Sequence, residues 1–203
     1  MRSLDFVVNS SEDRSLNEPI AVEVGLVSVT LNKTNAKLIK DNYDVIFTAG
    51  NSFGHMTGGF DGGLIDVFGG ELQEAVTNMI GTYYGGMMPV GASEVVTVGK
   101  HKIVYTPTMM VPTDRVDPLG PYFAMHHSLR ALALHALETD TYHDRILTPL
   151  FCTGTAKVPH ETALFQQNEA LVEFQKARNQ ESIGCNDLFE DGMKRYNELV
   201  RVR

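Results

Sequence analysis

One stretch, DVIFTAGNSFGHMTGGFDGGLI from Asp44 to Ile65, constrains the fold of this chain more than any other. It opens with the apolar run Val45-Ile46-Phe47, which is typical of a buried strand within residues 43–49. It then turns through AGNSFG and ends in four glycines within six residues, followed by residues of helical periodicity from Leu64. A strand, a glycine-rich turn and a helix N-terminus predict a phosphate cradle, because backbone N–H groups and the helix dipole favour an anion there. No Lys-Ser/Thr pair follows the glycines and the spacing is not GxGxxG, so the stretch is neither a Walker loop nor a Rossmann turn.

Hydrophobic periodicity and turn residues divide the rest of the chain into alternating elements. The expected strands are residues 4–8, 20–30 (one strand or a bent pair), 43–49, 94–98, 102–106 and 145–151. The expected helices are residues 35–42, 64–80 with an interruption at Gly69-Gly70, 122–137, 161–177 and 187–200. Residues 107–121 are expected to form a proline-rich loop, and the polar residues 178–187 to separate the last two helices. This order predicts a three-layer α/β/α domain with a mixed central sheet and ligand groups at the carboxyl ends of strands.

Composition narrows the classes of function. The 203 residues carry a net charge of −8 and contain no basic run, so the sequence lacks the electrostatic footprint of a nucleic-acid-binding protein. Cys152 and Cys185 fit no zinc pattern, and His126-His127 has no carboxylate or Cys at ligand spacing, so reduced thiols and no metal site are expected. No signal peptide and no 18-residue apolar run is found, which predicts a cytoplasmic protein without a membrane span.

Several of these segments together resemble the macro domain, the ADP-ribose-binding family. DVIFTAGNS followed by TGGFDGGLI resembles its first signature, a strand, an Asn-Ala-Ala-Asn-like turn and a glycine run with Val-Asp-Gly-Ala-Ile. TPLFCTGTAKVP resembles its second, a strand followed by Ser-Thr-Gly-x-aromatic-Gly-x-Pro, and GGMMPVGAS resembles the segment between them. IVYTPTMMVP is similar to a strand and loop of a bacterial and phage subset. The resemblance covers about residues 20–177 and implies one macro-like domain over residues 1–203, with residues 178–203 as a helical extension.

The resemblance assigns roles to the first glycine-rich stretch. Asn51 would hydrogen-bond the distal ribose of ADP-ribose, since its amide both donates and accepts. Asp61 would lie near the anomeric carbon, where hydrolytic members use it to activate water or to orient the ribose, so catalysis would depend on Asp61 and Asn51. The residues alone leave open an Asn that caps the turn and an Asp that caps the helix. Backbone amides of the glycines would approach the ribose and the phosphate, or the glycines would form a plain flexible turn: Gly50, Gly58, Gly59 and Gly62.

The second signature implies a second phosphate loop, in which backbone N–H groups cradle the diphosphate. Its residues here are Thr153, Gly154, Thr155, Ala156 and Lys157. Ala156-Lys157 replaces the family's aromatic-Gly pair, which removes a wall over the ribose. Lys157 would supply a cation beside the diphosphate or a proton donor to a leaving group, or it would be a solvated surface lysine. The family's adenine-reading Asp is not found either, because the corresponding VGLVSVTLN offers Ser28 and Thr30, so the identity of the base stays open.

Other residues of these segments carry weaker indications. His55 follows the turn and would act as a base or stay solvated, and Phe53 or Tyr83 would stack on a ligand base. The other aromatic residues of the signatures are expected in the core: Phe60, Phe151 and Phe165.

Three functions follow from the resemblance. The first is binding of ADP-ribose or a related NAD-derived nucleotide without any further cofactor, which the backbone cradles favour. The second is hydrolysis, either removal of ADP-ribose from an ADP-ribosylated macromolecule or release of phosphate from ADP-ribose-1″-phosphate. The third is a structural protein that has kept the fold and lost the ligand. The sequence indicates no oligomeric state.

Overall fold

The computed structural model describes residues 3–8, 23–28, 31, 33–141, 143, 145–178, 192–194 and 196–201. Its centre is a six-stranded sheet in the order β2-β1-β6-β3-β5-β4, in which β4 is antiparallel to β5 and all other neighbours are parallel. The expected mixed sheet is therefore confirmed. The strands are β1 (Ser3–Val8), β2 (Glu23–Ser28), β3 (Val45–Asn51), β4 (Glu94–Val98), β5 (His101–Met109) and β6 (Arg145–Pro149).

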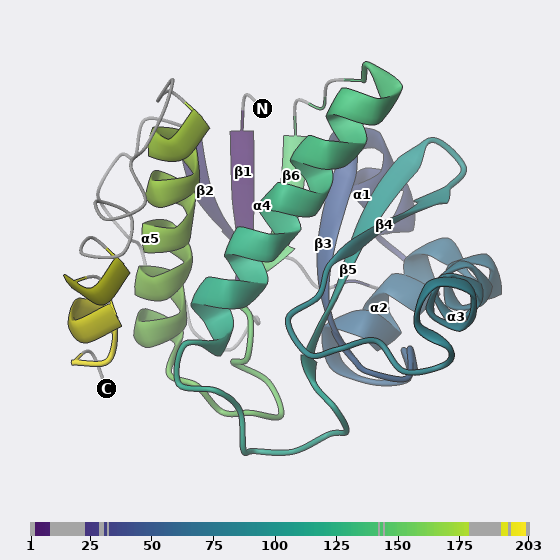
Figure 1. The fold of residues 1–203 in the computed structure, drawn as a ribbon. Coiled ribbons are helices and arrows are strands. Elements are labelled where there is room, and N and C mark those ends of the chain that lie inside the picture. Colours follow the sequence, from purple (N-terminus) through teal and green to yellow (C-terminus); the bar gives the residue numbers. More distant parts are fainter. Residues whose placement is uncertain are drawn as a thin grey trace.

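Helices cover both faces of the sheet, which confirms the three layers (Figure 1). Alternate residues of β3 show why: Val45 and Phe47 pack with α4 and α5, whereas Ile46 packs with α1, α2 and α3. Such alternation follows from the two-residue period of a strand that is buried on both faces. The helices are α1 (Ala36–Asn42), α2 (Gly59–Phe68), α3 (Gly70–Tyr84), α4 (Gly120–Thr139) and α5 (His160–Arg178).

The start of α2 differs from the sequence prediction. The helix begins at Gly59, inside the glycine run, rather than at Leu64. Glycine is normally unfavourable within a helix, but a methyl group at Gly63 would lie 2.6 Å from the Leu31 Cβ, so close packing requires glycine there. The expected break is confirmed, because Gly69 has φ 79° and separates α2 from α3.

The end of the strand expected at residues 102–106 was also wrong. β5 continues through Pro107, where a loop was expected; β4 begins at Glu94 opposite Tyr105, so Pro107 lies beyond the β4 ladder, where a strand tolerates proline. The strand expected at residues 4–8 is confirmed as β1, which pairs with β2 and β6. The expected hairpin between β4 and β5 is confirmed, with Gly99 at φ 58°.

Two phenylalanines, the two cysteines and the end of the chain complete the comparison with the sequence. Phe151 is fully buried as expected, whereas Phe165 is 37% exposed, so its assignment to the core was wrong. Cys152 is a buried free thiol, and Cys185 lies outside the described residues, as do residues 179–187 of the polar segment. Of the expected last helix, residues 192–194 and 196–199 are helical. No helix in the described part of the chain is long and apolar enough to cross a membrane.

Candidate functional site

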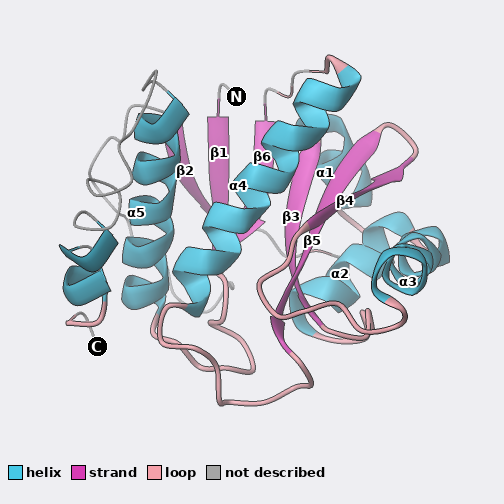
Figure 2. Ribbon diagram, in the orientation of Figure 1, coloured by secondary structure: helices cyan, strands magenta, loops and turns pink. Residues whose placement is uncertain are grey.

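A cavity of about 690 Å³ lies where β3, β5 and β6 end. Asn51, Met109 and Pro149 are the last residues of these strands, and all three line the cavity. The carboxyl ends of parallel strands meet at one edge of a sheet, where ligands bind in α/β folds. The loops that follow β5 and β6 gather at this edge (Figure 2). The volume is in the range of small-molecule and cofactor sites.

Asp61 is the buried acid of this cavity, with 6% of its surface exposed. It lies in the first turn of α2, and its carboxyl group is hydrogen-bonded to the hydroxyl of Thr48 on β3. Burial raises the pKa of Asp61 to about 7, and the bond from Thr48 only partly opposes this. The N-cap of α2 is Gly58, so the expectation of Asp61 as helix cap was wrong. A carboxyl group with such a pKa exchanges protons near neutral pH, as a general acid or base must.

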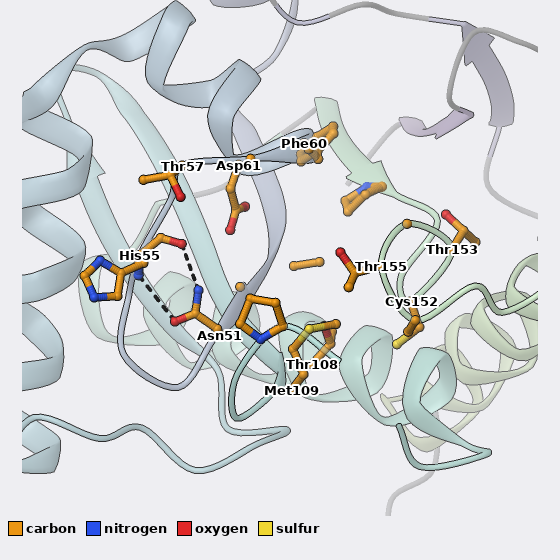
Figure 3. A pocket seen from close by; sticks show the side chains of 18 of the residues that line it. Asn51, His55, Thr57, Phe60, Asp61, Thr108, Met109, Cys152, Thr153 and Thr155 are labelled. Carbon is orange, nitrogen blue, oxygen red and sulfur yellow. Dashed lines mark hydrogen bonds between the residues drawn. The ribbon is translucent and has the colours of Figure 1, made fainter. Parts of the chain in front are cut away.

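The side chain of Asn51 holds the turn that follows β3. Its Nδ2 donates to the His55 carbonyl oxygen at 2.8 Å, and its Oδ1 accepts from the N–H groups of Phe53 at 3.1 Å and His55 at 3.4 Å. Figure 3 shows Asn51 beside His55, with Asp61 and Thr155 placed around the same space. In the structure, the Asn51 side chain therefore caps the turn, as one of the two interpretations of the sequence expected. One Nδ2 hydrogen remains beyond these bonds, because an amide carries two.

A second loop, residues 150–158, forms the opposite wall of the cavity. Cys152 and Lys157 have positive φ, 65° and 57°, although neither is glycine. The Lys157 N–H group donates to the Gly154 carbonyl oxygen at 3.0 Å, which closes the turn. Burial raises the pKa of the Cys152 thiol to about 12, so this cysteine stays protonated and is no nucleophile.

Each loop is held by a glutamine from a helix. Gln73 of α3 accepts from the Met56 N–H group at 3.0 Å and donates to the Gly54 carbonyl oxygen at 2.5 Å. Gln167 of α5 accepts from the Phe151 N–H group at 2.7 Å and donates to the Pro149 carbonyl oxygen at 3.0 Å. The backbone of both loops is thus fixed from behind, away from the cavity.

Two sets of backbone N–H groups remain for a ligand. Among the described residues no acceptor is found for the amides of Gly154, Thr155 and Ala156. The same holds for residues 59–61, since the first amide of α2 to bond within the chain is that of Gly62, which donates to the Gly58 carbonyl oxygen at 3.0 Å. Both sets belong to residues that line the cavity. Such paired amides form an anion-binding site.

The structure brings most of the predicted site residues together. Those that line the cavity are Gly50, Asn51, Gly58, Gly59, Asp61, Thr153, Gly154, Thr155 and Ala156. Gly62 and Lys157 are not among the lining residues. His55, Phe53 and Phe60 line the cavity as well, and Phe60 also packs against the core as expected. Tyr83 is 71% exposed and is not among the lining residues.

The lining also contains residues that sequence reasoning missed. Thr108 and Met109 contribute from the end of β5, inside the segment expected to be a loop, and Cys152 contributes from the second loop. No lysine or arginine is among the described lining residues, and no cluster of three metal-ligating side chains occurs in the described ranges. The groups that the described lining offers to an anion are therefore backbone amides and hydroxyl groups.

No protein-family model matches this sequence, and no curated protein matches it. Solved structures do. A macrodomain of Oceanobacillus iheyensis with ADP superimposes with a TM-score of 0.54 at 20% identity, over 66% of this chain and 70% of that one. The chain has the macrodomain fold. The macrodomain of Mycobacterium tuberculosis DarG matches with a TM-score of 0.52 at 15% identity, over 65% of this chain and 83% of that one. In this macrodomain fold the cavity lies beside α2, at the N-terminus of the helix that begins within the glycine run.

Proposed function

We propose that this protein binds ADP-ribose or a related NAD-derived nucleotide in the cavity. The observation that carries the proposal is the pair of unbonded amide sets, residues 59–61 and 154–156, that line one cavity from two loops. A diphosphate presents acceptor oxygens in two directions, so amides on both walls suit it. Two of the structurally similar macrodomains from O. iheyensis are described with ADP and with ADPR, which supports this ligand class.

The chemistry of Asp61 fits an anionic ligand. Because its pKa is about 7, much of Asp61 is neutral near neutral pH, which lowers its repulsion of a phosphate. The Asn51 amide has a hydrogen left to donate to a ribose hydroxyl group, as the resemblance implies. The contacts expected from Gly62 and Lys157 stay predictions, as does the cytoplasmic location.

Isothermal titration calorimetry with ADP-ribose tests the binding function. We expect saturable heat for the wild-type protein and about tenfold weaker binding for Asn51→Ala, since a lost hydrogen bond that leaves a polar group unpaired costs about 1–3 kcal/mol. Asn78→Ala, at an exposed position of α3, is the matched control and should bind like wild type. Absence of heat with ADP-ribose and with its phosphorylated and cyclic variants would exclude the proposal.

A second candidate function is hydrolysis, favoured by one observation: a buried carboxyl group in the cavity that titrates near pH 7. The substrate would be an ADP-ribosylated macromolecule or ADP-ribose-1″-phosphate, with Asp61 activating water or orienting the ribose. Release of ADP-ribose or of phosphate should then fall at least about a hundredfold in Asp61→Asn, the size typical of losing a general base. Asp66→Asn, on the exposed side of the same helix, should keep full turnover. Binding without turnover in the wild-type protein would leave the first function and remove this one.

A further inference from the structure

Tyr105 lies beneath the first loop and takes no direct part in lining the cavity. Its side chain is fully buried on β5. The hydroxyl group accepts from the Asn51 N–H group at 3.1 Å and donates to the Asn51 carbonyl oxygen at 2.8 Å. One side chain therefore satisfies both backbone groups of the residue that begins the first loop.

The sheet explains why a tyrosine is needed at this point. The register between β3 and β5 shifts here, with Gly50 opposite Pro107 and Asn51 opposite Met109. Pro107 has no N–H group to donate, so the ladder is interrupted where β3 ends. The hydroxyl group of Tyr105 fills the interruption by pairing both the N–H and the carbonyl group of Asn51.

Gly50 is what admits the hydroxyl group. A methyl group at this position would lie 2.0 Å from the Tyr105 hydroxyl oxygen, which is far inside contact distance. Burial, followed by the nearby charge of Asp61, raises the pKa of Tyr105 above its ordinary range. The hydroxyl group consequently keeps its proton and can always donate to Asn51.

We infer that Tyr105 is a positioning residue of the binding site: its hydroxyl group fixes the backbone of Asn51 and thereby directs the Asn51 amide toward the distal ribose of the ligand. The inference rests on the proposed function, since it assigns a task to Asn51 in ligand binding. Tyr105 acts through Asn51 and touches no ligand atom.

The test is Tyr105→Phe, which removes one oxygen atom and keeps the ring. We expect about fivefold to tenfold weaker binding of ADP-ribose in calorimetry and little change for ADP, which lacks the distal ribose. In the double variant with Asn51→Ala, Tyr105→Phe should add little further loss. Tyr84→Phe, which removes a 2.7 Å bond to Glu94 away from the cavity, is the control. Equal losses for both ligands, or fully additive losses with Asn51→Ala, would overturn the inference.

A second readout separates this inference from the proposed function. Amide hydrogen exchange in the ligand-free protein should show the Asn51 N–H group protected in the wild type and exchanging at least about tenfold faster in Tyr105→Phe. Unchanged exchange would overturn the positioning role even if ADP-ribose binds. If the Asn51 N–H group exchanged faster in Tyr105→Phe but the wild-type protein bound neither ADP-ribose nor ADP, the proposed binding function would be excluded. The role of Asn51 in ligand binding would then be excluded as well.

Discussion

The two loops that face each other across the cavity keep their shape by different means. The first, residues 51–58, depends on side chains: the Asn51 amide bridges to residues 53 and 55, and Tyr105 holds its start. The second, residues 150–158, is also held at its start by Gln167, but its turn depends on backbone conformation, with Cys152 and Lys157 in the left-handed region and backbone hydrogen bonds that close it. The first loop thus brings a functional side chain, that of Asn51, to the cavity, whereas the second loop offers backbone N–H groups. Substitutions should therefore affect the two walls unequally.

The largest expected effect concerns Asp61, the acid beside the first loop. Because burial raises its pKa from 3.8 to about 7, the folded protein holds a proton that the unfolded chain has lost in this pH window. The free energy of unfolding therefore falls as pH rises through the window, and the loss is complete above about pH 7. A shift of this size corresponds to roughly 4 kcal/mol. Asp61→Asn should remove the dependence and be more stable than wild type at pH 8, measured by urea unfolding at pH 5 and pH 8.

The control for this experiment is Asp66→Asn, whose side chain is exposed on the same helix. It should retain the wild-type slope of stability against pH. If Asp61→Asn kept that slope as well, Asp61 would not be the group that causes the pH dependence, and its carboxyl group would not be held neutral by burial.

The next effect compares one glycine from each wall. Gly50→Ala places a methyl group 2.0 Å from the Tyr105 hydroxyl oxygen and should lower the free energy of unfolding by about 3 kcal/mol. In Gly154→Ala the new methyl group meets nothing within 4 Å, so stability should change by less than about 1 kcal/mol. Thermal unfolding of both variants measures the contrast. Equal destabilisation would mean that the contact between position 50 of β3 and Tyr105 does not require glycine.

A smaller effect should separate the two glutamines. Gln167 is fully buried, so Gln167→Ala leaves the Phe151 N–H group unpaired away from water and removes one of the two bonds to the Pro149 carbonyl oxygen, at a cost of about 2–3 kcal/mol. Gln73 is only half-buried, and water can replace it, so Gln73→Ala should cost about 1 kcal/mol. Urea unfolding ranks the two variants. If Gln73→Ala were the more destabilising of the two, the deeper burial of Gln167 would not be what sets the cost.

The smallest effect is a gain. A left-handed conformation costs a residue with a side chain about 1–2 kcal/mol, and the greater freedom of unfolded glycine offsets about 0.5–1 kcal/mol of that. Lys157→Gly should thus stabilise the protein by about 0.5 kcal/mol, detectable as a raised urea midpoint. Destabilisation would indicate that the Lys157 side chain makes a contact that supports the second loop.

Much of the fold follows from local signals in the sequence. The apolar run before Asn51, the break at Gly69 and the turn at Gly99 each predicted the element that the structure contains. The start of α2 could not be predicted, because a glycine run disfavours a helix until the contact of Gly63 with Leu31 is known. Pro107 likewise indicated a loop, and only the end of the β4 ladder explains the strand.

The sequence predicted the backbone groups that line the site better than it predicted the side chains that hold them in place. The glycine signatures indicated both sets of amides, because that signal is local. The partners of Asn51 and Asp61 were not predictable, since Tyr105 and Thr48 reach them through the sheet, and a hydroxyl group on a strand carries no distinctive pattern. Gln167 was missed for the same reason, as its contact with Phe151 depends on how α5 packs.

A titration of isotope-labelled protein with ADP-ribose, followed by two-dimensional ¹H–¹⁵N NMR, tests whether both walls of the cavity hold one ligand. We expect the amide signals of residues 59–61 and 154–156 to shift together and to saturate with one affinity, because one diphosphate is held from both walls. Signals that stay unchanged, or shifts that are confined to one of the two loops, would contradict it.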